Sequence, residues 1–564
     1  MARTVAIGIQ NYADLREKNA FYIDKTAFIK EWWNNMDAVT LITRPRRFGK
    51  TLNMSMLECF FSDRYAGRSD LFEGLSIWED EKFREIQGTY PVIFLSFAGV
   101  KGKDYPDTMM GIKKQIVKVF SGFSFLRGFE GLDENEREAL AKIREDMNDV
   151  DAAYAINLLC TLLEKYYGKK TIVLLDEYDT PMQEAYVNGF WDELTAFIRM
   201  MFNNTFKTNP ALERGIMTGI TRVSKESIFS DLNNLKVVTT TSDAYATCFG
   251  FTEEEVFAAM DEQGIPEKEK AEVKRWYDGF TFGTVPDIYN PWSVIMYLDE
   301  QKFAPYWANT SGNRLVGKLL REGDRKVKME LETLLNGGCV EKEIDEQIIY
   351  NQLSQRKDAI WSLLLASGYL KVESIKRDTP EEVPVYVLSL TNLEIRYMFR
   401  NMITEWFDQS EAFSDFVSAM FAGDEMEMND YMNEVALSTS SSFDTGKHPS
   451  GKKEPERFYH GFVLGLLVDK AKDYVVKSNR ESGYGRYDVV MEPKDVKNIA
   501  IIIEFKVFDA RRGEKDLEDT AKNALQQIED KRYDADLLAK GIPAERIYKY
   551  GFAFEGENCL IRKA

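Results

Sequence analysis

The chain has 564 residues, of which 44% are hydrophobic, so several domains with buried cores are expected at roughly 100–200 residues per domain. The formal net charge of −19 argues against a protein that coats nucleic acid nonspecifically. The five cysteines are far apart and only two histidines occur, so a metal centre must use mainly carboxylates, which favours Mg²⁺ or Mn²⁺ over zinc.

The first 40 residues are predicted to form a short strand at 5–9 and then a helix through the tryptophans at 32 and 33. Asp24 is the natural N-cap of that helix. The run Asp24-Lys25-Thr26 either only caps the helix or also lies near a nucleotide, and both interpretations stay open here.

Residues 39–51 have the layout of a phosphate-binding loop: a β-branched strand, a basic turn, Gly-Lys-Thr and an apolar helix pattern. In such a loop the backbone N–H groups face an anion, the lysine reaches the terminal phosphates and the threonine holds Mg²⁺. The usual glycine five residues before Gly49 is replaced by Arg44. The alternative is an ordinary basic turn between a strand and a helix. The candidate nucleotide ligands are Arg44, Arg46, Arg47, Gly49, Lys50 and Thr51.

An acidic pair follows a buried run further along the chain. Residues 171–175 are apolar or β-branched, and Asp176 and Glu177 come directly after them, as expected where a central parallel strand ends. At that place Asp176 is expected to organise Mg²⁺ beside the phosphate loop, and Glu177 to polarise the attacking water. Acids that merely solvate a loop are the alternative.

Two more strands are predicted, at 91–97 and 215–222, with helical patterns between about 107 and 167. The second strand ends at Arg222, which either senses the γ-phosphate of a nucleotide or is a surface residue. Strands that alternate with helices over 1–245 predict a doubly wound α/β sheet.

The middle of the chain is predicted to be mainly helical. Aromatic segments at 276–280 and 289–292 interrupt the helices and favour a packed lid or inter-domain joint. A helix–hairpin–helix order over 358–400 indicates a winged-helix-like unit, which either binds DNA or mediates packing. The segment 438–453 is rich in Ser, Gly and Lys and is predicted to be a linker.

The C-terminal part has a different charge balance and a second set of acids. Residues 451–564 contain 22 Lys and Arg against 21 Asp and Glu, a net charge of +1, which permits a basic groove. On the predicted strand 499–507, Glu504 and Lys506 are two residues apart and share a face. Asp488 opens the preceding strand and can lie alongside them.

This arrangement suits the hydrolysis of a phosphodiester. Two carboxylates can hold one or two Mg²⁺ ions against the scissile phosphate, and the lysine can orient or deprotonate the attacking water. A following helix pattern at 521–533 carries Gln526, Gln527 and Tyr533, and a glutamine there can touch the metal site or the DNA backbone. A structural salt bridge between Glu504 and Lys506 is the alternative.

Taken together, these motifs resemble bacterial proteins that fuse an N-terminal AAA-ATPase-like domain to a C-terminal PD-(D/E)XK nuclease-superfamily domain. The resemblance covers nearly the whole chain. It is carried by the segments 21–26, 44–51, 175–179, 218–222 and 289–292 in the first domain, and by Glu456, 458–460, 478–481, 485–488 and 504–506 in the second.

The resemblance implies an α/β protein with a P-loop (AAA-like) parallel sheet, a helical and winged-helix-like middle region, and a small restriction-endonuclease-like domain. It implies ATP binding and a metal-dependent nuclease fold. Thr51 and Asp176 are then expected to hold the nucleotide's Mg²⁺, with Asp488 and Glu504 as ligands of the nuclease metal. Glu456 and Glu481 are expected to support the nuclease site.

The function expected from the sequence is therefore that of an ATP-binding, ATP-hydrolysing protein that cleaves DNA with Mg²⁺ or Mn²⁺. A nucleotide-gated switch that binds DNA or a protein without cutting is the second hypothesis, and an interaction scaffold the third. No apolar run of about 18 residues and no signal-peptide pattern occur, which predicts a cytoplasmic protein without membrane contact; a homo-oligomer is possible. The predicted domains are 1–248, 249–350, 351–437 and 454–564, with the linker at 438–453.

Overall fold

The computed structural model describes residues 3–221, 228–229, 232–307, 314–323, 325–345, 359–377, 379, 382–406, 410–433, 465, 472–478, 481–482, 485–486, 488–555 and 558–564. Internal contacts divide the chain into two units, Met1–Gly312 with Glu341–Ile395, and Asn313–Val340 with Arg396–Ala564. The predicted linker at 438–453 lies outside the described residues, and so does the helix expected from Glu456, apart from residue 465.

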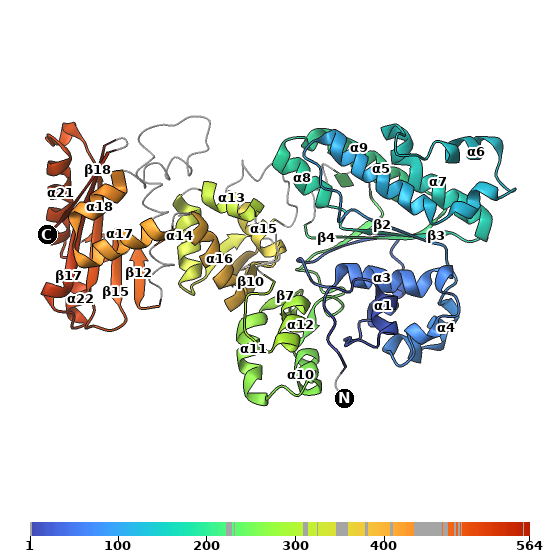
Figure 1. Ribbon diagram of the computed structural model, residues 1–564, viewed down its shortest axis with the longest axis horizontal. Coiled ribbons are helices and arrows are strands. Elements are labelled where there is room, and N and C mark those ends of the chain that lie inside the picture. The colour runs from blue at the N-terminus through green and yellow to red at the C-terminus, as the bar shows by residue number, and fades with distance from the viewer. Residues whose placement is uncertain are drawn as a thin grey trace. The chain divides into compact units, whose positions relative to one another are not determined.

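The first unit is built on a parallel sheet of five strands in the order β2-β3-β4-β1-β5. Strands β1 to β4 are largely buried, because helices cover both faces of the sheet: α1, α3 and α4 lie on one face and α5, α7 and α9 on the other (Figure 1). The edge strand β5 is only partly buried. This confirms the predicted doubly wound sheet. The strands are β1 (Val39–Thr43), β2 (Val92–Ser96), β3 (Thr171–Asp176), β4 (Leu212–Gly219) and β5 (Leu235–Val238).

The helices of this sheet begin at side-chain caps in several cases, as at Asp104 for α5 and Asn148 for α7. In the described part of the chain, no helix is both long and apolar enough to cross a membrane. The helices are α1 (Tyr12–Glu17), α2 (Ala27–Asn35), α3 (Lys50–Phe61), α4 (Glu81–Ile86), α5 (Tyr105–Ser121), α6 (Glu134–Ala141), α7 (Asp149–Tyr167), α8 (Thr180–Asn188) and α9 (Trp191–Phe202).

Two predictions for the first 40 residues are wrong. Residues 5–9 form no strand, because Gly8 turns the backbone with φ 83° and Ile7 is exposed instead of packing on the sheet. Helix α2 begins at Ala27 with Thr26 as its N-cap. Asp24 instead accepts hydrogen bonds from the backbone N–H groups of Thr26 and Ser76, 2.8 Å each, which ties the chain together before the helix.

A small aromatic subdomain follows the sheet in the first unit. Segment 276–280 connects the end of α11 to the start of β7, and segment 289–292 connects the end of β8 to the start of α12; the strands pair in the order β6-β8-β7. Tyr277, Tyr289 and Tyr297 are fully buried in its core, which explains the concentration of aromatic residues there. Its elements are β6 (Phe251–Thr252), α10 (Glu253–Glu262), α11 (Lys270–Tyr277), β7 (Phe280–Phe282), β8 (Val285–Tyr289) and α12 (Pro291–Glu300).

The expected helix–hairpin–helix order follows this subdomain in the chain and consists of α15, the strands β10 and β11, and α16. The hairpin β10–β11 pairs from Leu370↔Leu390 onward, and β9 extends it to a three-stranded sheet. The elements are α13 (Arg314–Glu322), α14 (Arg325–Leu335), β9 (Val340–Glu343), α15 (Ala359–Ala366), β10 (Leu370–Lys376), β11 (Val385–Leu390), α16 (Leu393–Trp406), α17 (Ser410–Ala422) and α18 (Glu425–Tyr431).

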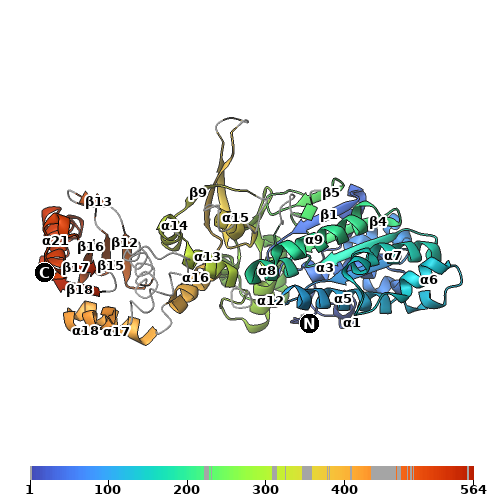
Figure 2. The ribbon, with the colours of Figure 1, turned by 90° about the horizontal axis from the view of Figure 1, so that it is seen from above.

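The second unit contains a mixed sheet in the order β12-β15-β16-β17-β18, in which only β16 and β17 are parallel. Helix α21 covers one face and α17 and α18 cover the other (Figure 2). Ile502 packs with Ile528 on the α21 side, whereas Tyr550 donates a hydrogen bond to the carbonyl of Met420 on the other side. The elements are β12 (Tyr474–Ser478), β13 (Glu481–Ser482), β14 (Gly485–Arg486), β15 (Val489–Pro493), β16 (Ala500–Val507), α21 (Leu517–Asp530), α22 (Ala535–Ala539), β17 (Ile547–Glu555) and β18 (Asn558–Lys563).

Candidate functional site

The basic loop between β1 and α3 leads directly into the helix N-terminus. Gly49 is the N-cap of α3 with φ 76°, a conformation that favours glycine. The buried Lys50 ammonium donates to the loop carbonyls of Arg44 at 3.0 Å and Pro45 at 2.8 Å. Burial lowers the pKa of Lys50, and the carboxylates of Glu177 and Asp179 oppose this shift. The loop carbonyls thus hold the lysine in place. An anionic phosphate oxygen accepts a hydrogen bond from an ammonium more strongly than a carbonyl does, so a phosphate could replace these partners.

The structure brings Thr51 and Asp176 together, although 125 residues separate them in sequence. Thr51 Oγ1 donates to Asp176 Oδ2 at 2.8 Å, and Thr218 Oγ1 at the end of β4 donates to Asp176 Oδ1 at 2.6 Å. Asp176 is fully buried, and this burial raises its pKa against the effect of the two hydrogen bonds. A hydroxyl and a carboxylate at this place match the ligand chemistry of Mg²⁺.

Glu177 lies beside this pair in a left-handed backbone conformation, with φ 52°. Its N–H donates to Thr218 Oγ1 at 3.4 Å, and its carboxylate accepts from Thr180 Oγ1 at 3.2 Å. A non-glycine residue with positive φ is uncommon and marks a constrained position next to the acids. Arg222, predicted to sense the γ-phosphate, lies outside the described residues.

The three loop arginines have three different environments. Arg44 is buried, donates to the carbonyls of Thr43 at 2.9 Å and Thr239 at 2.7 Å, and burial lowers its pKa to about 10. Arg46 Nη2 donates to Gln183 Oε1 at 3.2 Å. Arg47 is exposed, has φ 65°, and lies 4.5 Å above the Trp292 ring. The side chain that replaces the usual loop glycine therefore faces carbonyl groups of the protein itself.

The aromatic subdomain contacts the same loop. Phe48 is buried between Phe280 and Phe282, with ring centroids 4.7 and 5.4 Å away. Asn290 Nδ2 donates to the carbonyl of Arg46 at 3.4 Å. The segment 289–292, interpreted from sequence as part of a lid or joint, thus touches the basic loop between β1 and α3 directly.

No sequence pattern assigned a role to Asp179, yet its side chain is almost fully buried beside Asp176 and Glu177. Its Oδ2 accepts hydrogen bonds from the N–H groups of Ile220 at 2.9 Å and Thr221 at 3.0 Å, just beyond β4. Burial raises its pKa, which these backbone donors oppose. Its position two residues after Glu177 was the only sequence feature that pointed to this residue. Sequence spacing alone did not show that Asp179 would bind the backbone just beyond β4.

Close packing at Gly219 yields the first prediction. A methyl group on Gly219 would lie 2.5 Å from the Tyr178 ring and 2.8 Å from Asp179 Oδ1, so Gly219→Ala forces these side chains to move. We expect a loss of about 1–3 kcal/mol in the free energy of unfolding, measured by chemical denaturation. Gly99→Ala is the matched control, because Gly99 is exposed with open space around it. Equal stability of both variants would contradict the packing.

The second acidic set lies on the face of the C-terminal sheet that α21 covers. Asp488 directly precedes β15, and its Oδ2 accepts from the N–H of Phe505 at 2.8 Å, which places Asp488 beside Glu504 on β16. Lys506 lies two residues further along the same face. The three side chains predicted to form a nuclease site are therefore neighbours.

Helix α21 supplies a glutamine to this set. Gln527 donates through Nε2 to Glu504 Oε1 and to the Tyr533 hydroxyl, the latter at 3.1 Å, while its Oε1 accepts from Lys506 Nζ at 2.7 Å. Of the two glutamines that sequence reasoning considered, Gln526 instead bonds to Asp530 on the helix surface. The helix ends at Asp530, so the expected helical range to Tyr533 is three residues too long.

Glu504 is more deeply buried than Asp488. It is buried, and among the described residues its Oε2 has no hydrogen-bond partner. Burial, followed by the charge of Asp488, raises the pKa of Glu504 to about 8, against the opposing effect of Lys506. Glu456 lies outside the described residues, and of Glu481 only the backbone, in β13, is described.

Comparison with known families agrees with these two sets of residues. Residues 6–229 match the family described as predicted AAA-ATPase, and residues 454–564 match the PD-(D/E)XK nuclease superfamily. The chain thus joins an N-terminal region similar to the predicted AAA-ATPase family to a C-terminal region similar to the PD-(D/E)XK nuclease superfamily. The phosphate loop and the acids of β3 belong to the ATPase-like domain, and Asp488, Glu504 and Lys506 to the nuclease-like domain.

The chain is also similar over its whole length to a protein of Azotobacter chroococcum mcd 1 described as an uncharacterized protein in the vnfD 5' region. The two are 24% identical over 567 residues, which cover 99% of this chain and 97% of the relative. The similarity therefore extends over both of the regions of this chain that match a family.

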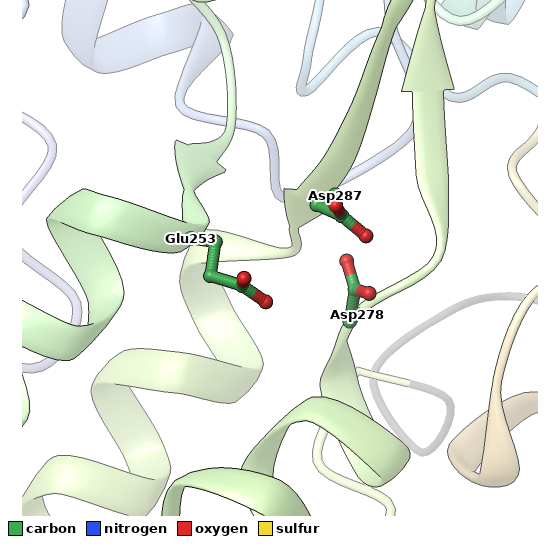
Figure 3. Close-up of side chains that lie close together, drawn as sticks. All are labelled: Glu253, Asp278 and Asp287. Carbon is green, nitrogen blue, oxygen red and sulfur yellow. The ribbon is translucent and has the colours of Figure 1, made fainter.

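A further group of acids follows the ATPase-like domain, in the aromatic subdomain. Figure 3 shows the carboxyl groups of Glu253, Asp278 and Asp287 converging. The Lys274 ammonium lies 3.2 Å from Asp287 and 3.9 Å from Asp278, and it also contacts Glu253. Burial raises the pKa of Asp278 to about 7. Because a lysine already occupies the position of a cation, we assign this group to ion pairing within the subdomain.

Proposed function

We propose that the chain binds and hydrolyses ATP with Mg²⁺ and cleaves DNA phosphodiesters in its nuclease-like domain. The observation that carries the second half is the Asp488–Glu504–Lys506 set, in which a buried carboxylate oxygen of Glu504 lacks a hydrogen-bond partner among the described residues. Such an oxygen is costly unless a cation binds it. The phosphate loop with the Thr51–Asp176 pair supports the first half.

The donor set of the nuclease-like domain fits a divalent metal. Asp488 and Glu504 supply carboxylate oxygens, which Mg²⁺ and Mn²⁺ prefer. A metal bound there would polarise the scissile phosphate and lower the pKa of a bound water. Lys506, held by Gln527, would orient that water or take its proton.

In the ATPase-like domain, Lys50 would leave the loop carbonyls for the β- and γ-phosphates. Thr51 and Asp176 would hold the nucleotide's Mg²⁺, and Glu177 would orient the attacking water. Arg46 and the exposed Arg47 are the loop arginines proposed to reach phosphate. Arg44 would act indirectly, because its guanidinium is already bound to Thr43 and Thr239.

The pH dependence of the free energy of unfolding provides a direct test of the proposed nuclease metal site. Between the ordinary pKa of 4.5 and the folded value of about 8, Glu504 holds a proton in the folded chain that the unfolded chain has released. The free energy of unfolding from this group therefore falls as pH rises through that window. Without metal, we expect Glu504→Gln to be more stable than the wild type above about pH 8, with a gap that shrinks toward pH 5.

The same variant reports on metal binding. Because Mg²⁺ favours the ionised carboxylate, it is expected to raise the melting temperature of the wild type at alkaline pH more than that of Glu504→Gln. Glu545→Gln, an exposed acid of the same domain, should behave like the wild type. A stability gap independent of pH, together with equal Mg²⁺ effects on both proteins, would rule out the metal site.

A further inference from the structure

A row of hydrogen bonds connects the phosphate loop with the end of β4 through helix α8. Arg46 Nη2 donates to Gln183 Oε1 at 3.2 Å, and Gln183 Nε2 donates to Asp179 Oδ2 at 3.2 Å. The same Asp179 oxygen accepts from the N–H groups of Ile220 and Thr221. One amide side chain thus stands between a loop cation and a buried acid.

The chemistry of Asp179 fixes the orientation of the Gln183 amide. Asp179 Oδ2 accepts hydrogen bonds from two backbone N–H groups and therefore acts as an acceptor, so the Gln183 NH₂ group must face it. The carbonyl oxygen of Gln183 is then turned toward Arg46, where it accepts one N–H of the guanidinium. An arginine has five N–H donors in a rigid plane, so one such bond orients the others without consuming them.

The end of β4 is held from several sides. The Tyr178 hydroxyl donates to the carbonyl of Thr221 at 2.7 Å, and the N–H of Arg44 donates to the carbonyl of Gly219 at 3.1 Å. Asp179 is therefore anchored by a segment that is itself bonded to the start of the phosphate loop. This gives the Gln183 amide a rigid support.

We propose that Gln183 is a positioning residue of the ATP site: it holds Arg46 in the orientation in which this cation contacts the terminal phosphate. This inference rests on the proposed ATP function and adds a residue to it. Loss of Gln183 would leave the loop and Lys50 in place but remove the hydrogen bond that orients Arg46 Nη2. The affinity for ATP should then fall more than the affinity for ADP, because only ATP has the terminal phosphate that Arg46 contacts in this proposal.

The test uses the full chain with Mg²⁺ and compares Gln183→Leu, Gln183→Glu and the wild type. We measure the affinities for ATP and ADP and, where ATP turns over, kcat and KM. Gln183→Leu removes both hydrogen bonds and is expected to lower the ratio of ATP to ADP affinity about tenfold, with ADP affinity changed less than about threefold. Gln183→Glu keeps an acceptor for Arg46 but removes the donor to Asp179, so its ratio should fall between those of Gln183→Leu and the wild type.

Two controls separate positioning from a loss of structure. Asn188→Leu, an exposed position at the end of the same helix, should leave the ratio unchanged. In a double-mutant cycle, Gln183→Leu should add little to Arg46→Ala, because it acts through that arginine. An unchanged ratio in Gln183→Leu, or full additivity with Arg46→Ala, would overturn the inference while leaving the ATP site intact. A wild type that binds no ATP would overturn the proposed function and this inference with it.

Discussion

Lys50→Ala is expected to weaken ATP binding by about tenfold to a hundredfold and to abolish ATP turnover. The reason is the loss of a charge-assisted hydrogen bond to phosphate, each of which contributes about 1.5–3 kcal/mol. The ammonium now lies 2.8–3.0 Å from two loop carbonyls, at the N-terminus of α3. A nucleotide that binds there must exchange these contacts for its own oxygens.

Affinity is measured by titration with a fluorescent ATP analogue, and folding is checked by thermal denaturation. Because the Lys50 side chain is buried, the variant also loses packing, so its melting temperature must be compared with the wild type first. Lys142→Ala removes an exposed lysine of the same domain and should bind like the wild type. Unchanged affinity in a folded Lys50→Ala protein would show that the nucleotide site is assigned to the wrong loop.

Lys506→Ala is expected to lower DNA cleavage by about 10²–10⁴-fold, the usual effect of removing a group that serves proton transfer. In the structure, Lys506 Nζ donates to Gln527, which also bonds to Glu504, so the lysine is fixed beside the carboxylates. The substitution leaves both acids, so Mg²⁺ should still raise the melting temperature. This combination separates the role of Lys506 from that of the metal ligands.

Cleavage is followed with end-labelled linear DNA under single-turnover conditions. Lys531→Ala, which removes an exposed lysine after the neighbouring helix, is the matched control and should cut like the wild type. If Lys506→Ala cuts as fast as the wild type, the lysine has no part in the reaction and forms only a structural contact with Gln527.

The sequence was sufficient to predict those strands and site residues that depend on a local pattern. The apolar or β-branched runs at 171–175 and 499–503 predict strands, and the acids that follow these runs predict which side chains reach a sheet edge. The pairing of Thr51 with Asp176 follows from the same rule, since parallel strands end at one edge. These are consequences of periodicity and strand direction.

Sequence reasoning was insufficient where distant segments meet. The contact of Arg44 with Thr239, and that of Gln183 with Arg46, depend on strand order and on the placement of α8, which no local pattern encodes. The same limit explains residues 5–9, whose β-branched composition suggests a strand although none of the described strands pairs with them. Secondary structure alone does not determine which elements become neighbours.

Cleavage of linear and branched DNA by the full chain, with Mg²⁺ or Mn²⁺ and with or without ATP, tests the proposed nuclease activity. We predict metal-dependent cutting by the wild type that Lys506→Ala loses, and an ATP response that Lys50→Ala alters. No cutting of any substrate by a folded protein that still binds ATP would contradict the nuclease assignment. It would instead support a nucleotide-gated switch whose nuclease-like domain binds without cleaving.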